Sequence, residues 1–391
     1  MNIVLFDEPK IKTSLLPFTF TRPVAEIRVG IFTIADKWRR IANSQVSFLT
    51  DEYLSKKFAS KNSGDNYIIN GALLPDEKIF QAIAKLEKGE ALVKEGLLLA
   101  VRADFLPFYE EIDSFFTEYS IEEYGGNIVC LKHHWDIFAL NGAAIKADFA
   151  TLDMQKSKEI IDPHTIIYRK ENIYVEDGAD VKAAILNAES GPIYIGKNAQ
   201  IQEGAIVRGP FALCEGSVVN MGSKMRGDTT IGPYSKVGGE INNSVIFGYS
   251  NKSHDGFMGN SVLGEWCNLG ADTNTSNLKN NYSNVKVWDY FTSNFIDSNR
   301  QFCGLMMGDH SKAGINTMFN TGTVVGVHAN IFGGGFPPKF IPSYSWGGSD
   351  GFDKYDFDKA LQVASKVMER RNVVLENEDY AIFKHIFAMA I

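Results

Sequence analysis

The chain has 391 residues, which exceeds the usual size of one domain, so we expect at least two. Hydrophobic residues make up 45% and charged residues 22%, a balance that excludes disorder, and no run of about 18 uncharged apolar residues predicts a membrane span. The net charge of −8 argues against a broad surface for nucleic acid or anionic lipid, and leaves room only for a local basic pocket that binds a phosphate.

Two features of the sequence predict a cytoplasmic protein. The N-terminal residues lack the basic and apolar regions of a signal peptide. The four cysteines are scattered without a CxxC pair, so neither a disulfide framework nor a structural zinc site is expected.

Residues 1–165 alternate short apolar runs with segments of helical periodicity. The predicted buried strands are Asn2–Phe6, Val46–Leu49, Tyr67–Ile69, Ala91–Val93 and Leu97–Val101. The predicted helices are Ala25–Ile41, Leu54–Lys61, Glu77–Lys88 and Phe105–Glu118, followed by a linking helix over Trp135–Lys158. This alternation predicts an α/β, Rossmann-like domain with a parallel sheet covered on both faces.

Residues 166–350 carry a repeat of six residues. Its regular core is Ile195, Ile201, Val207, Leu213, Val219, Met225, Ile231 and Val237, mostly followed at the fourth position by a small residue. The period resumes at Asn251, Phe257, Leu263 and Leu269, and again at Met307, Ala313, Phe319, Val325 and Ile331. A period of six fits a hexapeptide solenoid, in which three units form a triangular coil of about 18 residues and the aliphatic residue points inward. The pattern resembles the left-handed parallel β-helix of hexapeptide-repeat acyltransferases.

Two segments depart from the repeat. Residues 275–304 form a long polar and aromatic excursion, for which a functional arm is favoured over a flexible insertion. Residues 351–391 form a helical extension, with helices predicted over Asp356–Arg371 and Glu376–Met389, where a terminal helix can cap the open end of the solenoid.

Within the repeat, residues 250–282 read SNKSHDGFMGNSVLGEWCNLGADTNTSNLKNNY. This stretch resembles the acetyltransferase half of the bacterial enzymes that join glucosamine-1-phosphate acetyltransferase to N-acetylglucosamine-1-phosphate uridyltransferase. The resemblance implies a catalytic His254 with Glu240, coenzyme A-binding residues Ala271 and Lys279, and the substrate-binding residues Arg226, Lys252, Phe257, Asn268 and Asn277. The family's tyrosine is replaced by Phe257, and Asn242 stands where the family has a phosphate-binding lysine.

These residue types suit acetyl transfer to an amine. A histidine that titrates near neutrality can take the proton of the amine, and Glu240 or Asp255 can orient its ring. Arg226 and Lys252 can hold a sugar phosphate by charge-assisted hydrogen bonds. The structural alternative is that His254 is a solvated turn residue, that the asparagines cap turns and that Phe257 belongs to the core. His310 and His328 are expected to be structural.

The N-terminal region carries a second resemblance. Residues 15–30, LLPFTFTRPVAEIRVG, resemble a stretch of the sugar-phosphate nucleotidylyltransferases, whose first strand ends in a Gly-rich loop that holds the nucleotide phosphates. This chain has no glycine in that loop, so Lys10, Lys12 and Arg22, with Arg28, are the weak candidates for nucleotide binding. Asp76 and Asp104 are weak substitutes for the family's Mg²⁺ ligand.

Both resemblances occur in the order found in the bifunctional enzymes. They imply a homotrimeric enzyme of sugar-nucleotide synthesis that acetylates an amino-sugar phosphate with acetyl-CoA, and that uses a nucleoside triphosphate and Mg²⁺ if nucleotidyl transfer is retained. Two alternatives remain open: a nucleotidyltransferase whose β-helix only oligomerises it, and a non-catalytic scaffold that binds sugar nucleotides.

Overall fold

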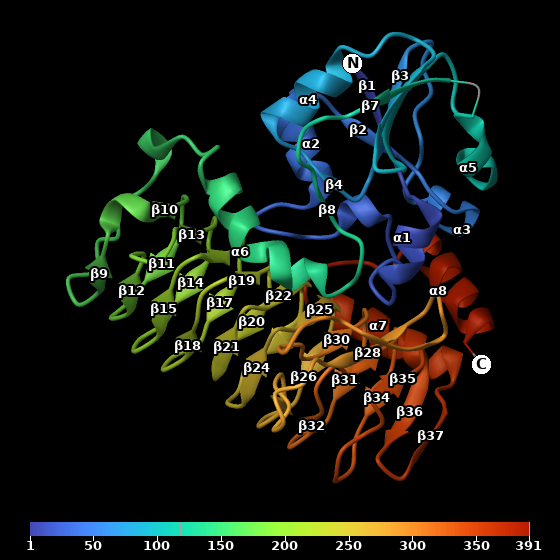
Figure 1. Cartoon of the computed structure of the whole chain (residues 1–391). Helices are drawn as coiled ribbons and strands as arrows, with labels where there is room; N and C mark the ends of the chain where they lie inside the picture. The colour runs from blue at the N-terminus through green and yellow to red at the C-terminus, as the bar shows by residue number, and fades with distance from the viewer. Residues whose placement is uncertain (118, 391) are drawn as a thin grey trace.

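The computed structural model describes residues 1–117 and 119–390, and it places an α/β domain against the side of a long parallel β-helix (Figure 1). The C-terminal helices fill the angle between these two parts. In the described part of the chain, no helix is both long enough and apolar enough to cross a membrane.

The N-terminal domain contains a six-stranded sheet of order β2-β1-β3-β6-β5-β7. Its strands are β1 (Asn2–Phe6), β2 (Val46–Leu49), β3 (Asn66–Asn70), β5 (Glu90–Lys94), β6 (Leu97–Ala103) and β7 (Ser120–Glu123), and a small ladder joins β4 (Leu73–Leu74) to β8 (Val129–Cys130). All five predicted strands are present, but the sheet is mixed, because β6 runs antiparallel to β3 and β5. The two-residue turn Glu95–Gly96, with positive φ at both positions, makes β5 and β6 a hairpin.

The helices cover both faces of this sheet. They are α1 (Pro9–Ser14), α2 (Ile34–Ala42), α3 (Glu52–Ser55), α4 (Glu77–Ala84), α5 (Ile112–Phe115) and α6 (Asp136–Phe149), with 3-10 turns η1 (Val24–Glu26), η2 (Tyr109–Glu111), η3 (Met154–Lys156) and η4 (Lys170–Asn172). Ile3 and Leu5 pack with residues of α2 and α4, while Val4 and Phe6 face the cluster that contains Ile112 of α5. Most helices are shorter than predicted. The segment predicted over Phe105–Glu118, whose last residue lies outside the described chain, is interrupted early by Pro107.

The β-helix has three parallel sheets, which form the three faces of a prism. The first face contains β10 (Ile173–Val175), β13 (Ile193–Ile195), β16 (Phe211–Leu213), β19 (Thr229–Ile231), β22 (Val245–Gly248), β25 (Val262–Glu265), β30 (Met306–Met307), β33 (Val324–Val325) and β35 (Phe340–Ile341). The second contains β11 (Asp180–Val181), β14 (Gln200–Ile201), β17 (Val218–Val219), β20 (Lys236–Val237), β23 (Asn251–Lys252), β26 (Asn268–Leu269), β31 (Lys312–Ala313), β34 (Asn330–Ile331) and β36 (Ser345–Gly348), with β37 (Gly351–Lys354) added antiparallel. The third contains β9 (Ile166–Tyr168), β12 (Ile185–Asn187), β15 (Ile206–Arg208), β18 (Lys224–Met225), β21 (Glu240–Asn242) and β24 (Phe257–Gly259), and continues with β27 (Asn274–Thr275) and β32 (Met318–Phe319).

The period of six correctly predicts the residues that fill the prism. From Ile195 to Val237, every predicted inward side chain is at most 1% exposed. After Val237 the phase changes, because the next coil is shorter and Val237 pairs with Lys252, fifteen residues further on. Lys252 and Met258 therefore point inward, and the predicted inward positions of Asn251 and Phe257 are wrong by one residue.

The corner between the first and second faces carries a column of stacked rings, the corner stack: Tyr234, Tyr249, Trp266, His310, His328 and Tyr344. Neighbouring ring centroids are 4.2–6.1 Å apart. All six residues have φ between 52° and 60°, so the left-handed turn of each coil directs its ring outward onto the next. His310 and His328 lie in this stack as buried residues.

The two C-terminal helices are α7 (Phe357–Glu369) and α8 (Asn377–Met389), close to the predicted ranges. They lie along the corner stack and not across the end of the prism: Phe383 of α8 contacts the rings of His310 and His328 edge-on. The expected end cap is therefore wrong, and at the end of the second face the edge of β36 is covered by β37 instead.

The excursion at residues 275–304 folds back on the molecule. It forms the hairpin β28 (Lys286–Asp289) and β29 (Asn294–Asp297), which we call the arm hairpin. Trp288 stacks on Phe340 of the β-helix at 4.1 Å, and its carbonyl lies 3.1 Å from Nε2 of His134 in the N-terminal domain. The arm therefore packs between the two domains.

Candidate functional site

A groove runs along the corner between the second and third faces of the β-helix. This corner groove has a volume of about 780 Å³ and is lined by Gln202, Asn220, Met221, Gly238, Gly239, Ser253, His254, Asp255, Ala271 and Asp272. His254 lies on the turn between β23 and β24, and its side chain is exposed to solvent. Of the residues predicted for acetyl transfer, His254, Asp255 and Ala271 line this groove.

Lys252 holds the turn that carries His254. Its side chain fills an inward position of the prism and is fully buried, and its Nζ donates to the carbonyls of His254 at 2.6 Å and Asp255 at 2.8 Å. Burial lowers the pKa of Lys252 to about 8, and Asp255 and Asp272 oppose this shift. The ammonium is thus not exposed to a sugar phosphate, and the structure gives Lys252 a positioning role in place of the predicted binding role.

Arg226, Glu240 and Phe257 lie together on the third face, one strand away from the groove. Arg226 Nη1 and Glu240 Oε1 form an ion pair at 3.1 Å, with side chains 60% and 34% exposed. Glu240 is the register partner of Phe257, whose ring is half-buried on the outside of the prism. Phe257 therefore does not belong to the core, and the structural alternative is wrong for this residue.

The remaining predicted residues lie elsewhere. Asn268 points outward on the second face, opposite Asn251. Asn277 donates to Asn260 Oδ1 at 2.7 Å, and Lys279 donates to the Asn284 carbonyl and to Ser283 within the arm. The structure does not bring these three side chains into the corner groove.

In the N-terminal domain, α1 stands where nucleotidylyltransferases have their Gly-rich loop. The carboxylate of Glu8 caps α1 by accepting from the Ile11 amide at 2.6 Å, so an acidic group occupies the end at which a phosphate would bind. Lys12 is buried between Asp51 at 2.5 Å and Asp7 at 3.2 Å, while Lys10 is exposed. Burial raises the pKa of Asp7, which also accepts from the Val24 amide. The charge of Lys12 is thus matched within the protein.

Arg22 joins the two domains. Its guanidinium contacts the carboxylate of Asp309, which also accepts from Thr21 Oγ1 at 2.7 Å, and it lies 3.4 Å from Glu265. Both Arg22 and Asp309 are buried. Burial opposes the charge of Arg22, but Asp309 and Glu265 offset it, so that the pKa of Arg22 is raised. We call this contact the Arg22–Asp309 clamp. This structural contact stands in place of the predicted contact between Arg22 and a nucleotide.

The structure does not assign a ligand set for the expected Mg²⁺, which one or two carboxylates and the substrate phosphates can hold. Among the described residues, no three His, Cys, Asp or Glu side chains come together in a group that could hold a metal ion. Asp76 accepts from the Ile79 amide as the N-cap of α4, and Asp104 pairs with Lys88.

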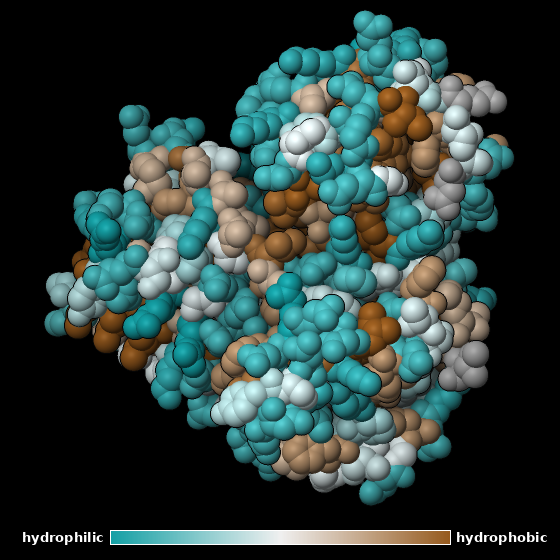
Figure 2. Space-filling model, viewed as in Figure 1, coloured by the Kyte–Doolittle hydropathy of each residue, from teal (hydrophilic) through white to brown (hydrophobic). Residues whose placement is uncertain are grey.

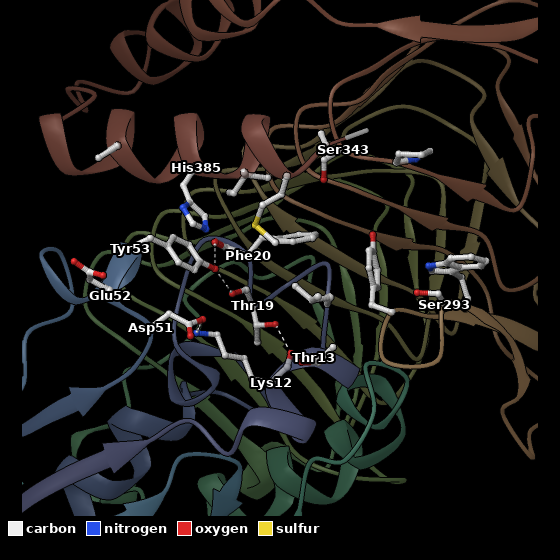
Figure 3. A pocket seen from close by; sticks show the side chains of 18 of the residues that line it. Lys12, Thr13, Thr19, Phe20, Asp51, Glu52, Tyr53, Ser293, Ser343 and His385 are labelled. Carbon is white, nitrogen blue, oxygen red and sulfur yellow. Dashed lines mark hydrogen bonds and ion pairs between the residues drawn. The ribbon is translucent and has the colours of Figure 1, made fainter. Parts of the chain in front are cut away.

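The sequence did not predict a cavity that lies between the two domains. This interdomain cavity of about 1110 Å³ lies between α1 and α3 of the N-terminal domain, the arm hairpin, the end of the first face and α8. Figure 3 shows Tyr53 beside His385 of α8 and Lys12 beside Asp51; the rings of Tyr53 and His385 stack at 4.2 Å. The aromatic run of the arm, Val287–Phe291, was the available signal, but its cavity partners come from distant segments.

Comparison with known proteins finds a family model that the N-terminal domain matches. Residues 3–157 match the family model described as sugar nucleotidyl transferase. The chain is 30% identical over 190 residues to a bifunctional sugar-1-phosphate nucleotidylyltransferase/acetyltransferase of Sulfurisphaera tokodaii, a match that covers 47% of this chain and 45% of that protein. It is 37% identical over 87 residues to the bifunctional protein GlmU of Methanocaldococcus jannaschii, covering 22% and 21%. The matched segments therefore span less than half of these relatives' own length.

A solved structure of the Arabidopsis UDP-N-acetylglucosamine acyltransferase matches 54% of this chain and 78% of that chain, with 16% identity and a TM-score of 0.24. The pairing of the strands in three parallel sheets establishes the β-helix. The chain thus combines an N-terminal domain that matches the sugar nucleotidyl transferase family model with a parallel β-helix, and the distant relatives that it matches are described as bifunctional.

Proposed function

We propose that the chain is a cytoplasmic enzyme of sugar-nucleotide synthesis whose corner groove transfers an acetyl group from acetyl-CoA to the amine of an amino-sugar phosphate. The observation that carries this proposal is the exposed His254, which a buried lysine holds on a groove of a β-helix that follows a sugar nucleotidyl transferase domain. The bifunctional relatives support it.

The chemistry assigns roles to the residues of this region. The neutral amine of the sugar attacks the thioester carbonyl, and His254 accepts the amine proton as the C–N bond forms. The C–S bond then breaks, and the thiolate of coenzyme A takes the proton back from His254. Arg226 lies one strand away with most of its side chain in solvent, so it can bind the sugar phosphate by charge-assisted hydrogen bonds.

The proposed enzyme is a homotrimer. Figure 2 shows apolar side chains along the edge of the β-helix where β12 and β15 lie. Ile166, Ile206 and Met318, on strands of the third face, are 51%, 45% and 38% exposed. A trimer that covers these side chains would remove them from water and set a neighbouring prism beside the groove.

Thiol release tests the acetyl transfer. Purified protein with acetyl-CoA and glucosamine-1-phosphate should release coenzyme A, and His254→Ala should lower kcat at least about 100-fold through loss of general-base catalysis. His164→Ala, at another exposed histidine of the β-helix, should leave kcat unchanged. The proposal fails if no amino-sugar phosphate gives thiol release, or if both variants behave like wild type.

Nucleotidyl transfer by the N-terminal domain is the second candidate, and the family match favours it. The carboxylate of Glu8 and the two carboxylates around Lys12 oppose binding of phosphates by the usual loop, so we expect pyrophosphate release to be slow. Pyrophosphate release without thiol release would favour the nucleotidyltransferase whose β-helix only oligomerises it. A rise in melting temperature with UTP or UDP-sugars, without either product, would favour the binding scaffold.

A further inference from the structure

The corner groove lies where one turn of the β-helix is shorter than its neighbours. Successive turns at this corner contain residues 220–224, 238–240 and 253–257, each flanked by strands of the second and third faces that pair in register. The middle turn lacks two residues, and it contributes Gly238 and Gly239, which have no side chains, to the groove. A recess therefore separates the turn of Asn220 from the turn that carries His254.

The side chain of Asn220 spans this recess. Its Nδ2 donates to the carbonyl of Ser253 at 2.8 Å, although the two residues are 33 positions apart in the sequence. Gly238 lies between them, and a side chain at this position would clash with the Ser253 oxygen. The main-chain carbonyl of Asn220 accepts from Ser223 Oγ at 2.5 Å, which fixes the base of the side chain.

Each carbonyl from residue 252 to residue 256 accepts a hydrogen bond. The first and the last accept from backbone amides of the shorter coil, and those of His254 and Asp255 accept from Lys252. The carbonyl of Ser253 lies between them, and no backbone amide of a described residue donates to it. Asn220 supplies its donor and so completes the hold on the turn.

The position of the His254 ring depends on this turn. The side chain is exposed, and among the described residues none forms a hydrogen bond with its ring. A general base must come within hydrogen-bond distance of the amine, and a displacement of about 1 Å can lower a rate about 100-fold. The hydrogen bonds to the backbone of the turn therefore place the ring relative to the groove.

We propose that Asn220 is a positioning residue for His254, which it holds in place through the Ser253 carbonyl. This inference rests on the proposed acetyl transfer, in which His254 takes the amine proton and Asn220 takes none. Lys252 holds the turn from inside the prism, and Asn220 holds it from the groove.

Kinetics of thiol release test this role. Asn220→Ala should lower kcat about tenfold and leave the KM for acetyl-CoA within about twofold of wild type, because the base is displaced while the groove remains. Asn220→Gln, which keeps an amide donor, should recover most of the loss. The matched control Asn172→Ala removes a similar bond, to the Ala188 carbonyl at 3.3 Å and outside the groove, and should leave kcat unchanged.

A double-mutant cycle separates positioning from a direct contact with substrate. If Asn220 acts through His254, then Asn220→Ala should not lower kcat further in a chain that already carries His254→Ala. An equal loss of kcat in both backgrounds would overturn the proposal, since Asn220 would then act on the substrate or on the fold as a whole.

Hydrogen exchange tests the hold on the turn without any reaction. The peptide of residues 251–258 should exchange roughly fivefold faster or more in Asn220→Ala, with wild-type exchange in Asn172→Ala and wild-type melting temperatures in both. Unchanged exchange would refute the proposal even if thiol is released. If Asn220→Ala does not fold, Asn220→Asp replaces it, because aspartate keeps the size of the side chain and lacks the donor.

The two measurements also separate this inference from the function on which it rests. Absence of thiol release by the wild type refutes acetyl transfer and, with it, a catalytic benefit from Asn220. Thiol release by the wild type together with unchanged kcat in Asn220→Ala refutes the positioning role alone.

Discussion

Asp309 connects the β-helix to the N-terminal domain through two interactions and is held by a third within the β-helix, and replacing it with alanine tests how strongly the domains hold each other. Its carboxylate contacts the buried guanidinium of Arg22 and accepts from Thr21 Oγ1 at 2.7 Å and from the Glu265 amide at 2.8 Å. In Asp309→Ala, Arg22 keeps one carboxylate partner among the described residues, Glu265 at 3.4 Å with a side chain 35% exposed, together with the uncharged Thr21 Oγ1 at 3.4 Å. The variant therefore leaves a buried charge largely uncompensated.

The expected loss follows from this geometry. Removing one partner of a buried, hydrogen-bonded ion pair costs about 3–5 kcal/mol, because the remaining charge stays out of water. For a domain of about 150 residues, each kcal/mol lowers the melting temperature by about 2–4 °C, so we expect a decrease of about 10 °C. Asp177→Ala removes an exposed ion pair with Lys158, whose two side chains are 78% and 55% exposed, and should change the melting temperature by about 1 °C or less.

Differential scanning calorimetry of the wild type and both variants measures these shifts. The double variant Arg22→Met with Asp309→Leu should recover most of the loss, since it removes the charge together with its partner. The reasoning is refuted if Asp309→Ala and Asp177→Ala have the same melting temperature, or if the double variant has a melting temperature as low as that of Asp309→Ala.

Two further predictions concern buried titratable groups. The pKa of Lys252 is lowered to about 8 in the folded protein, whereas in the unfolded chain it is about 10.4, so between these pH values the unfolded chain binds more protons. As the pH rises through this range, the free energy of unfolding of the wild type should therefore increase by about 2 kcal/mol relative to that of Lys252→Met. Urea unfolding of both proteins at pH 8 and 10 measures this difference. The prediction is contradicted if the free energies of unfolding of the two proteins change equally between these pH values. Burial lowers the pKa of His328 well below 6.5, so the unfolded chain takes up the extra proton in acid and stability falls below pH 6.5. His328→Phe should flatten this fall by up to about 1.4 kcal/mol per pH unit, and an unchanged slope between pH 7 and 5 would count against it.

Several features of the fold could be predicted from the sequence because they depend on residues that are close together along the chain. The inward residues from Ile195 to Val237 follow from a period of six, which is a property of each single coil. The prediction failed at Lys252, where one coil is shorter and the phase moves by a residue. A lysine in an inward position was read as a ligand-binding residue because the sequence does not show that its ammonium can reach two carbonyls of its own turn.

The candidate sites divide in the same way. His254 and Ala271 are within one stretch of the repeat, so their shared groove could be anticipated from the motif. Arg22 pairs with a residue 287 positions away, and its role depends on how the two domains dock. The interdomain cavity is lined by segments that lie far apart in the sequence, and no local pattern relates the arm to α3 or α8.

The sequence by itself determined the repeat, the residues inside most of the prism and the strands of the N-terminal sheet, because hydrophobic periodicity is local and burial follows it directly. Only the tertiary structure decided the direction of β6, the placement of the arm and C-terminal helices, and the Arg22–Asp309 clamp. These features arise from packing between residues that are distant along the chain, and their energies depend on burial and on partners that exist only after the domains have docked.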